Sequence, residues 1–103
     1  MDQGQAIRKV KRFAEVVRQH LPVCDVLLYG SYAKGRPRRY SDIDVAIVVD
    51  EYSGDLLDMK ARLFRLRRQI DVRIEPLLLE RKHDPARFLD EIARTGRLVA
   101  SYS

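Results

Sequence analysis

Two short apolar runs, each next to a polar motif, constrain the fold of this chain most. Val23 to Tyr29 is rich in β-branched and aromatic residues and is closed by the pair Gly30-Ser31. Ile43 to Val49 is the strongest strand signal in the sequence, and acidic residues mark its start. Apolar runs of this length, bounded by turn or polar residues, are typical of buried strands. We therefore expect two strands, one ending in a Gly-Ser turn and the other beginning with carboxylates.

The segments around these two runs have helical spacing. Apolar residues recur every three or four positions from Ile7 to Leu21 and from Leu56 to Leu66, with charged residues between them. Ser31 to Lys34 has the length of one turn of a short helix. Asp84-Pro85 is typical of a helix start, and Gly96 of the end of that helix. The sequence thus predicts helices before and between its strands.

A third strand is predicted where Ile70, Val72 and Ile74 alternate with charged residues, and we expect Pro76 to end it. Leu98 to Ala100 predicts a last, short edge strand. Helices and strands alternate along the whole chain, so the predicted fold class is α/β (α+β), with a mixed β-sheet of about four strands and helices packed mainly on one face. At 103 residues we expect residues 1–103 to form a single domain.

Composition limits where the chain works and what it binds. Its apolar runs are far shorter than the roughly 20 residues that cross a bilayer, so we expect no membrane span and no signal peptide. The single cysteine, Cys24, excludes an internal disulfide and favours a reducing cytoplasm. The net charge is +5, and basic clusters at residues 34–39 and 60–73 attract phosphates. A solvated helix face is the alternative for the second cluster.

Asp42 and Asp44 form the first candidate site. Side chains alternate along a strand, so these two carboxylates project from one face while Ile43 and Val45 project from the other. Adjacent carboxylates repel each other unless a cation or solvent relieves the repulsion. Mg²⁺ commonly takes one or two carboxylates together with substrate phosphates. Two aspartates that simply face water are the alternative for an isolated Asp-x-Asp.

The Gly30-Ser31 turn favours a metal site over two solvent-exposed aspartates at Asp42 and Asp44. Glycine lets a phosphate approach the backbone closely, and Ser31 adds a hydroxyl donor. Lys34 could neutralise phosphate charge, although a mobile basic loop fits it equally well. A turn with a purely structural role is the alternative for Gly30-Ser31. Together with the two aspartates, the turn predicts chemistry on a metal-bound nucleoside triphosphate.

Asp71 is the predicted third member of the site. In the expected strand, Asp71 lies beside Arg73 on the face opposite the core. A third carboxylate next to a metal could bind the ion and accept a proton from an attacking hydroxyl. The alternative is an ordinary ion pair between Asp71 and Arg73 or Arg68. Glu75 shares the face of Asp71 and either supports the site or forms an ion pair.

These residues also resemble a known family. Gly30-Ser31, a spacer, and then Asp42-Ile43-Asp44-Val45 is similar to the nucleotidyltransferase signature. The fuller run GSYAKGRPRRYSDIDVAIVV resembles the minimal nucleotidyltransferases (MNT), with Lys34 where arginine is more usual. The segment Gln69 to Arg73 is similar to the third-carboxylate strand of DNA polymerase beta. The resemblance covers residues 7–76, and three separate elements agree.

The resemblance implies the nucleotidyltransferase fold, a set of site residues, a reaction and a partner. It implies that Asp42, Asp44 and Asp71 hold two Mg²⁺ ions, and that Gly30 and Ser31 hold the triphosphate. A hydroxyl acceptor would receive a nucleoside monophosphate, with ATP as the expected nucleotide substrate and AMP as the transferred group. Minimal members often pair with a helical HEPN protein and serve as the antitoxin of a toxin–antitoxin system.

Two other functions compete with transfer. One is a catalytically silent antitoxin or adaptor module that binds a partner. The other is a nucleic-acid-binding protein that uses the basic helix from Lys60 to Arg68, although only Phe64 offers an aromatic ring there. We also expect a small domain with a one-sided sheet to associate, as a homodimer or with another chain. The acceptor cannot be named from the sequence.

Overall fold

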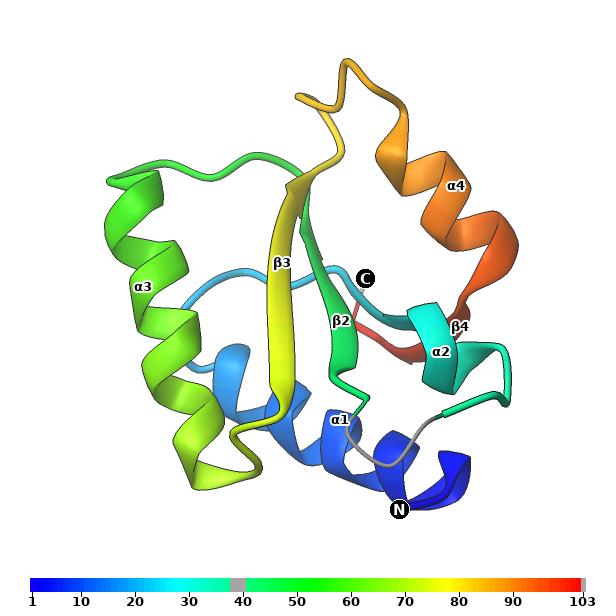
Figure 1. Ribbon diagram of the computed structural model, residues 1–103. Helices are drawn as coiled ribbons and strands as arrows, with labels where there is room; N and C mark the ends of the chain where they lie inside the picture. Colours follow the sequence, from blue (N-terminus) through cyan, green and yellow to red (C-terminus); the bar gives the residue numbers. More distant parts are fainter. Residues whose placement is uncertain (38–40, 103) are drawn as a thin grey trace.

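The protein folds as one four-stranded sheet with helices on both faces (Figure 1). The computed structural model describes residues 1–37 and 41–102, so the end of the predicted basic segment at residues 38 and 39 lies outside the described residues. The elements in chain order are α1 (Gln3–Val17), β1 (Asp25–Tyr29), α2 (Gly30–Ala33), β2 (Ile43–Val49), α3 (Leu56–Leu66), a 3-10 turn η1 (Arg67–Gln69), β3 (Ile74–Glu80), α4 (Phe88–Thr95) and β4 (Arg97–Ser101).

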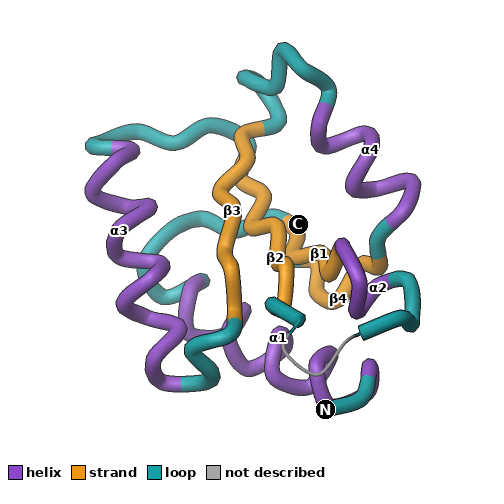
Figure 2. The backbone as a smooth tube through the Cα atoms, viewed as in Figure 1, coloured by secondary structure: helices purple, strands orange, loops and turns teal. Residues whose placement is uncertain are grey.

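The sheet has the strand order β3-β2-β1-β4. β1 pairs antiparallel with both β2 and β4, whereas β2 and β3 run parallel to each other. The sheet is therefore mixed, as predicted. The segments β2 and β3, which are distant in sequence, pair side by side, as the ribbon and the tube both show (Figures 1 and 2). Because β2 and β3 are parallel, both strands start at the same end of the sheet.

The two faces of the sheet bury different side chains of β2. Ile43, Val45, Ile47 and Val49 point toward α1 and α3 and belong to the larger core. Ala46 and Val48 point to the other face, where Ile92 of α4 covers them. Side chains alternate along a strand, so Asp44 shares the α4 face with Ala46 and Val48. The predicted packing of helices mainly on one face is confirmed, with α4 alone on the second face.

Several predicted elements have the expected bounds. β2 matches the predicted strand at both ends, and β4 is the predicted edge strand. Asp55 caps α3 by accepting a hydrogen bond from the Asp58 N–H at 3.0 Å. α1 begins earlier than predicted because Asp2 and Gln5 form a capping box, in which each side chain accepts from the backbone N–H of the other.

The third strand was predicted in the wrong place. β3 begins at Ile74 and continues through Pro76 to Glu80. Pro76 does not end it because β3 is an edge strand, where a residue without an N–H can face outward from the ladder. Val72, predicted to face the core, is 64% exposed in the turn before the strand.

The last helix also starts later than predicted. α4 begins at Phe88, after Arg87 adopts a left-handed backbone conformation with φ of 55°. Asp84 still satisfies the free end of the helix, because its carboxylate accepts from the N–H groups of Phe88 at 3.2 Å and Leu89 at 2.7 Å. Among residues 1–37 and 41–102, no helix has both the length and the apolar character needed to cross a membrane.

Candidate active site

Gly30 and Asp44 are in direct contact where β1 turns into α2. Gly30 has φ of +73°, a left-handed conformation that favours glycine. A Cβ atom at this position would overlap with Oδ2 of Asp44 and lie 3.2 Å from its Cγ. The glycine predicted to admit a phosphate therefore also makes room for the carboxylate of the second predicted site residue.

Asp44 lies at the centre of a row of polar side chains across three strands. Tyr29 of β1 is its partner in the antiparallel pair, and Glu75 of β3 is its partner in the parallel pair. The ring of Tyr29 packs edge-to-face on Phe88, with 6.2 Å between ring centroids. The row thus runs from an aromatic pair through Asp44 to a second carboxylate.

The pKa of Asp44 is raised by this environment. Partial burial is the largest cause, and the negative charges of Asp42 and Glu75 add to it. Burial, followed by the negative charges of Asp44 and Glu75, raises the pKa of Tyr29. Within the described part of the chain, neither Asp42 nor Asp44 forms an ion pair with a cation. Among the residues that the structure describes, a cation bound here would compete with no ion pair of Asp42 or Asp44.

The other residues of the predicted site lie around this row. Asp42 is exposed and directly precedes β2, whereas Asp44 is half-buried. Ser31 follows Gly30 in the single turn of α2, and Lys34 is the exposed residue that ends it. Strand alternation places Asp42 on the same face as Asp44, and the influence of Asp42 on the pKa of Asp44 agrees with that placement.

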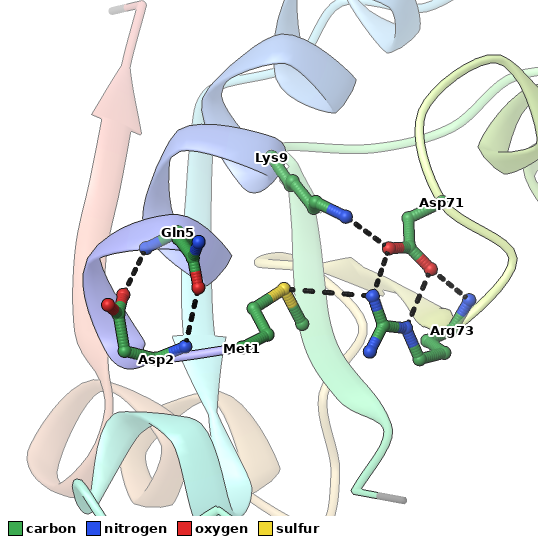
Figure 3. Close-up of polar contacts among 6 residues, drawn as sticks. All are labelled: Met1, Asp2, Gln5, Lys9, Asp71 and Arg73. Carbon is green, nitrogen blue, oxygen red and sulfur yellow. Dashed lines mark hydrogen bonds and ion pairs between the residues drawn. The ribbon is translucent and has the colours of Figure 1, made fainter. Parts of the chain in front are cut away.

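The carboxylate of Asp71 forms ion pairs with two cations, Lys9 and Arg73 (Figure 3). It lies in the turn between η1 and β3, where its side chain is 8% exposed. Its carboxylate accepts from Lys9 Nζ at 2.5 Å, and from Nη2, Nε and the backbone N–H of Arg73 at 2.7, 3.0 and 2.8 Å. The hydrogen bonds from Arg73 are the largest cause of a pKa far below the usual value. This is the ion pair that the sequence left open as the alternative for Asp71.

Glu75, and not the predicted third carboxylate Asp71, is the register partner of Asp44 on β3. It is in register with Asp44, 41% of its side chain is exposed, and Arg67 Nη1 lies 3.3 Å from its Oε1. The sequence predicted either a supporting role or an ion pair for Glu75, and the structure shows an ion pair with Arg67. One signal could have found it: β2 and β3 both begin with isoleucine, an acid and then an apolar run.

The donor set fits a divalent cation that substrate phosphates help to bind. Asp42 and Asp44 offer hard oxygen ligands, and a cation would favour the charged form of Asp44, whose pKa is raised first by burial and then by the charges of Asp42 and Glu75. In the part of the chain that the structure describes, no group of three or more His, Cys, Asp or Glu side chains could hold a metal by itself. Mg²⁺ sites completed by phosphates and water do not require such a cage.

A mixed sheet with an Asp-x-Asp strand beside a Gly-Ser turn defines the class of nucleotidyltransferase folds. The family model described as "Polymerase beta, Nucleotidyltransferase" matches residues 11–103. This chain therefore belongs to the nucleotidyltransferase family of DNA polymerase beta. No curated protein matches it with significant sequence similarity.

Solved structures share the fold. A proposed nucleotidyltransferase from Sulfolobus solfataricus is similar with a TM-score of 0.65 and 20% identity, over 93% of this chain and 80% of that one. A toxin–antitoxin structure with AMP-PNP is similar with a TM-score of 0.64 and 18% identity, over 94% of this chain and 74% of that one. A mutant of the toxin–antitoxin MntA-HpeT is similar with a TM-score of 0.61 and 16% identity, over 90% of this chain and 73% of that one. At these identities the likeness establishes the fold alone.

Proposed function

We propose that this chain is a Mg²⁺-dependent nucleotidyltransferase, a single domain that transfers AMP from ATP to a hydroxyl acceptor in a reducing cytoplasm. One observation carries the proposal: the carboxylate of Asp44 packs against Gly30 beside Asp42 and Glu75, and among the described residues only Glu75 of these three carboxylates pairs with a cation, Arg67. Family membership supports nucleotidyl transfer as the reaction.

In this proposal the turn at Gly30 binds the phosphates and the start of β2 binds the metal ions. Gly30 leaves the turn open to the β- and γ-phosphates, Ser31 donates its hydroxyl, and Lys34 adds positive charge at the end of the turn. Asp42 and Asp44 hold two Mg²⁺ ions. When bound, these ions lower the pKa of the attacking hydroxyl and stabilise the leaving pyrophosphate.

The third carboxylate has two candidates. Asp71 has the support of the family resemblance, but its side chain already accepts hydrogen bonds from Lys9 and Arg73. Glu75 has the support of its register with Asp44 and of its partial exposure. We assign the role to Glu75 first and keep Asp71 as the alternative, which the activity of single variants separates.

The transfer reaction is tested with α-labelled ATP, Mg²⁺ and a lysate of the source organism. The label is expected to appear on one acceptor with the native chain and not with Asp44→Asn. The matched control is Asp90→Asn, which removes a carboxylate with 78% of its side chain exposed on α4. Equal labelling by the native chain and Asp44→Asn would refute the metal assignment.

We further propose that the acceptor is a protein partner, a helical HEPN-type toxin for which this chain is the antitoxin. Two toxin–antitoxin structures share its fold, and one of them contains AMP-PNP. Co-purification with the product of a neighbouring reading frame, followed by intact-mass analysis of that product, tests this assignment. A gain of one AMP supports it. A homodimer remains the alternative assembly, which sedimentation of the purified chain tests.

The second candidate function is a silent binding module. The ion pairs that occupy Asp71 favour it, because they tie up one of the three carboxylates expected of an active site. Calorimetry with Mg²⁺–ATP separates the two functions. Tight binding of Mg²⁺–ATP with no AMP transfer to any partner would favour the module.

A further inference from the structure

A basic cavity lies between α1 and the turn that precedes β3, next to the start of β2, where the Ile43 N–H donates to the Arg73 carbonyl oxygen at 2.9 Å. Its volume is about 590 Å³, and its lining residues are Met1, Gln5, Arg8, Lys9, Arg12 and Arg73. Figure 3 shows Lys9 from α1 and Arg73 from the turn converging on Asp71. Among the described residues, the lining does not include those first proposed to hold ATP or metal, whereas Asp71, the alternative third carboxylate, pairs with two of the lining cations.

The charge of the cavity is not balanced by the protein. Four cations line it, and Asp71 pairs with only two of them, Lys9 and Arg73. Over the described ranges, Arg8 and Arg12 have no acidic partner. The nearby carboxylate of Asp2 accepts from the Gln5 N–H at 2.8 Å as the helix cap. Like charges four residues apart on a helix repel each other, so Arg8 and Arg12 favour a bound anion.

Two of the cations are held in place before any ligand binds. Asp71 is 8% exposed and accepts from the side chains of Lys9 and Arg73 at 2.5 to 3.0 Å. Lysine and arginine side chains normally lose much rotamer freedom when they bind a ligand, and pre-ordering reduces that loss. The buried carboxylate thus fixes one wall of the cavity, while the exposed Arg8 and Arg12 form the other.

We infer that this cavity binds a ligand with two or more phosphate groups. Its donors come from α1 and from the turn before β3, so they can contact several anionic oxygens at once. Three of the four lining cations among the described residues are guanidinium groups, each of which can bind two phosphate oxygens. Arg8 and Lys9 precede the segment that the family model matches, so the cavity depends on residues outside that segment. A free polyphosphate and a nucleic-acid backbone present the same chemistry.

Binding is measured in EDTA, so that metal at Asp42 and Asp44 does not contribute. The probes are inorganic tripolyphosphate, by calorimetry, and a fluorescein-labelled single-stranded oligonucleotide, by anisotropy. The double variant Arg8→Gln/Arg12→Gln removes the two unpaired cations without touching Asp71. It is expected to weaken binding by at least about tenfold and to lower the salt slope for the oligonucleotide by about 1.4, at roughly 0.7 per lost contact.

The matched control is Lys60→Gln/Arg65→Gln, which removes two exposed cations of α3 and lowers the net charge equally. It is expected to bind like the native chain. Tight binding of tripolyphosphate identifies a small phosphorylated ligand, and tight binding of the oligonucleotide alone identifies a nucleic-acid backbone.

Three results would overturn the inference: no binding of either probe at low salt, an equal loss in both double variants, or equally tight binding of a glutamate peptide. The inference does not depend on the proposed transfer reaction, because Arg8→Gln/Arg12→Gln changes probe binding through residues of α1, whereas a failure of transfer is read from labelling of an acceptor by the native chain and Asp44→Asn.

Discussion

Asp44 and Glu75 are register partners on two parallel strands, and each carboxylate lies in the electrostatic field of the other. Parallel pairing brings the second residue of β2 next to the second residue of β3. Like charges opposite each other in a sheet destabilise it. The free protein therefore gives up stability at the place where the candidate metal site lies.

We expect Asp44→Asn to raise the melting temperature in EDTA. The pKa of Asp44 is raised, so its charged form is less favourable in the folded than in the unfolded chain at neutral pH. Its destabilising effect should fade as pH falls through that raised pKa. The native chain, but not the variant, should gain stability when Mg²⁺ is added. Thermal denaturation with and without Mg²⁺ measures both effects, and a lower melting temperature of the variant in EDTA would contradict the first.

We expect Glu75→Gln to reduce nucleotidyl transfer more than Asp71→Asn does. Outer partners of metal ligands typically contribute about 10- to 100-fold, so a direct ligand should contribute more. Initial rates at several Mg²⁺ concentrations check this order. Lys9→Met is the control, because it removes a partner of Asp71 and leaves every carboxylate in place. The reverse order of the two variants would restore Asp71 as the third carboxylate.

We expect Gly30→Ala to cost more stability than Gly35→Ala. Both glycines have positive φ, at 73° and 70°, so both substitutions carry a backbone cost of about 1–2 kcal/mol. Only the Cβ at position 30 meets Asp44, whereas the Cβ at position 35 meets nothing within 4 Å. Urea denaturation measures each loss, and the difference reports the overlap with the carboxylate. Equal losses would mean that Asp44 moves aside freely.

We expect Asp71 to stabilise the fold at neutral pH and to lose that effect in acid. The pKa of Asp71 is far below its usual value because Arg73 and Lys9 donate to the carboxylate. Its contribution is complete above about pH 4, near the unfolded-state pKa, and declines as pH falls toward the folded-state pKa. Asp71→Asn should therefore cost about 2 kcal/mol at pH 7 and progressively less below pH 4. Chemical denaturation from pH 7 to pH 2 checks the trend.

Local signals were sufficient for much of the fold. Every residue of β2 except Asp44 is apolar, so the run could only be a buried strand. Asp55 could be recognised as a helix cap because that role depends on neighbouring N–H groups alone. The contact between Gly30 and Asp44 was implicit in the Gly-Ser and Asp-x-Asp motifs, since β1 and β2 pair as neighbours.

Long-range relations decided what the sequence could not provide. Pro76 ends a strand in isolation, and its tolerance here depends on β3 lying at the edge of the sheet. The choice between a catalytic and an ion-paired Asp71 depends on Lys9, which lies 62 residues away along the chain. The spacing of Asp71 and Arg73 alone could not reveal that second cation.

The packing of Gly30 on Asp44 has a consequence for how relatives of this chain can diverge. Only a residue without a side chain fits at position 30 while the carboxylate at 44 keeps its place. The two positions should consequently change together in related sequences. A relative with a larger residue at position 30 should also lack the acid at position 44, and with it the proposed metal site.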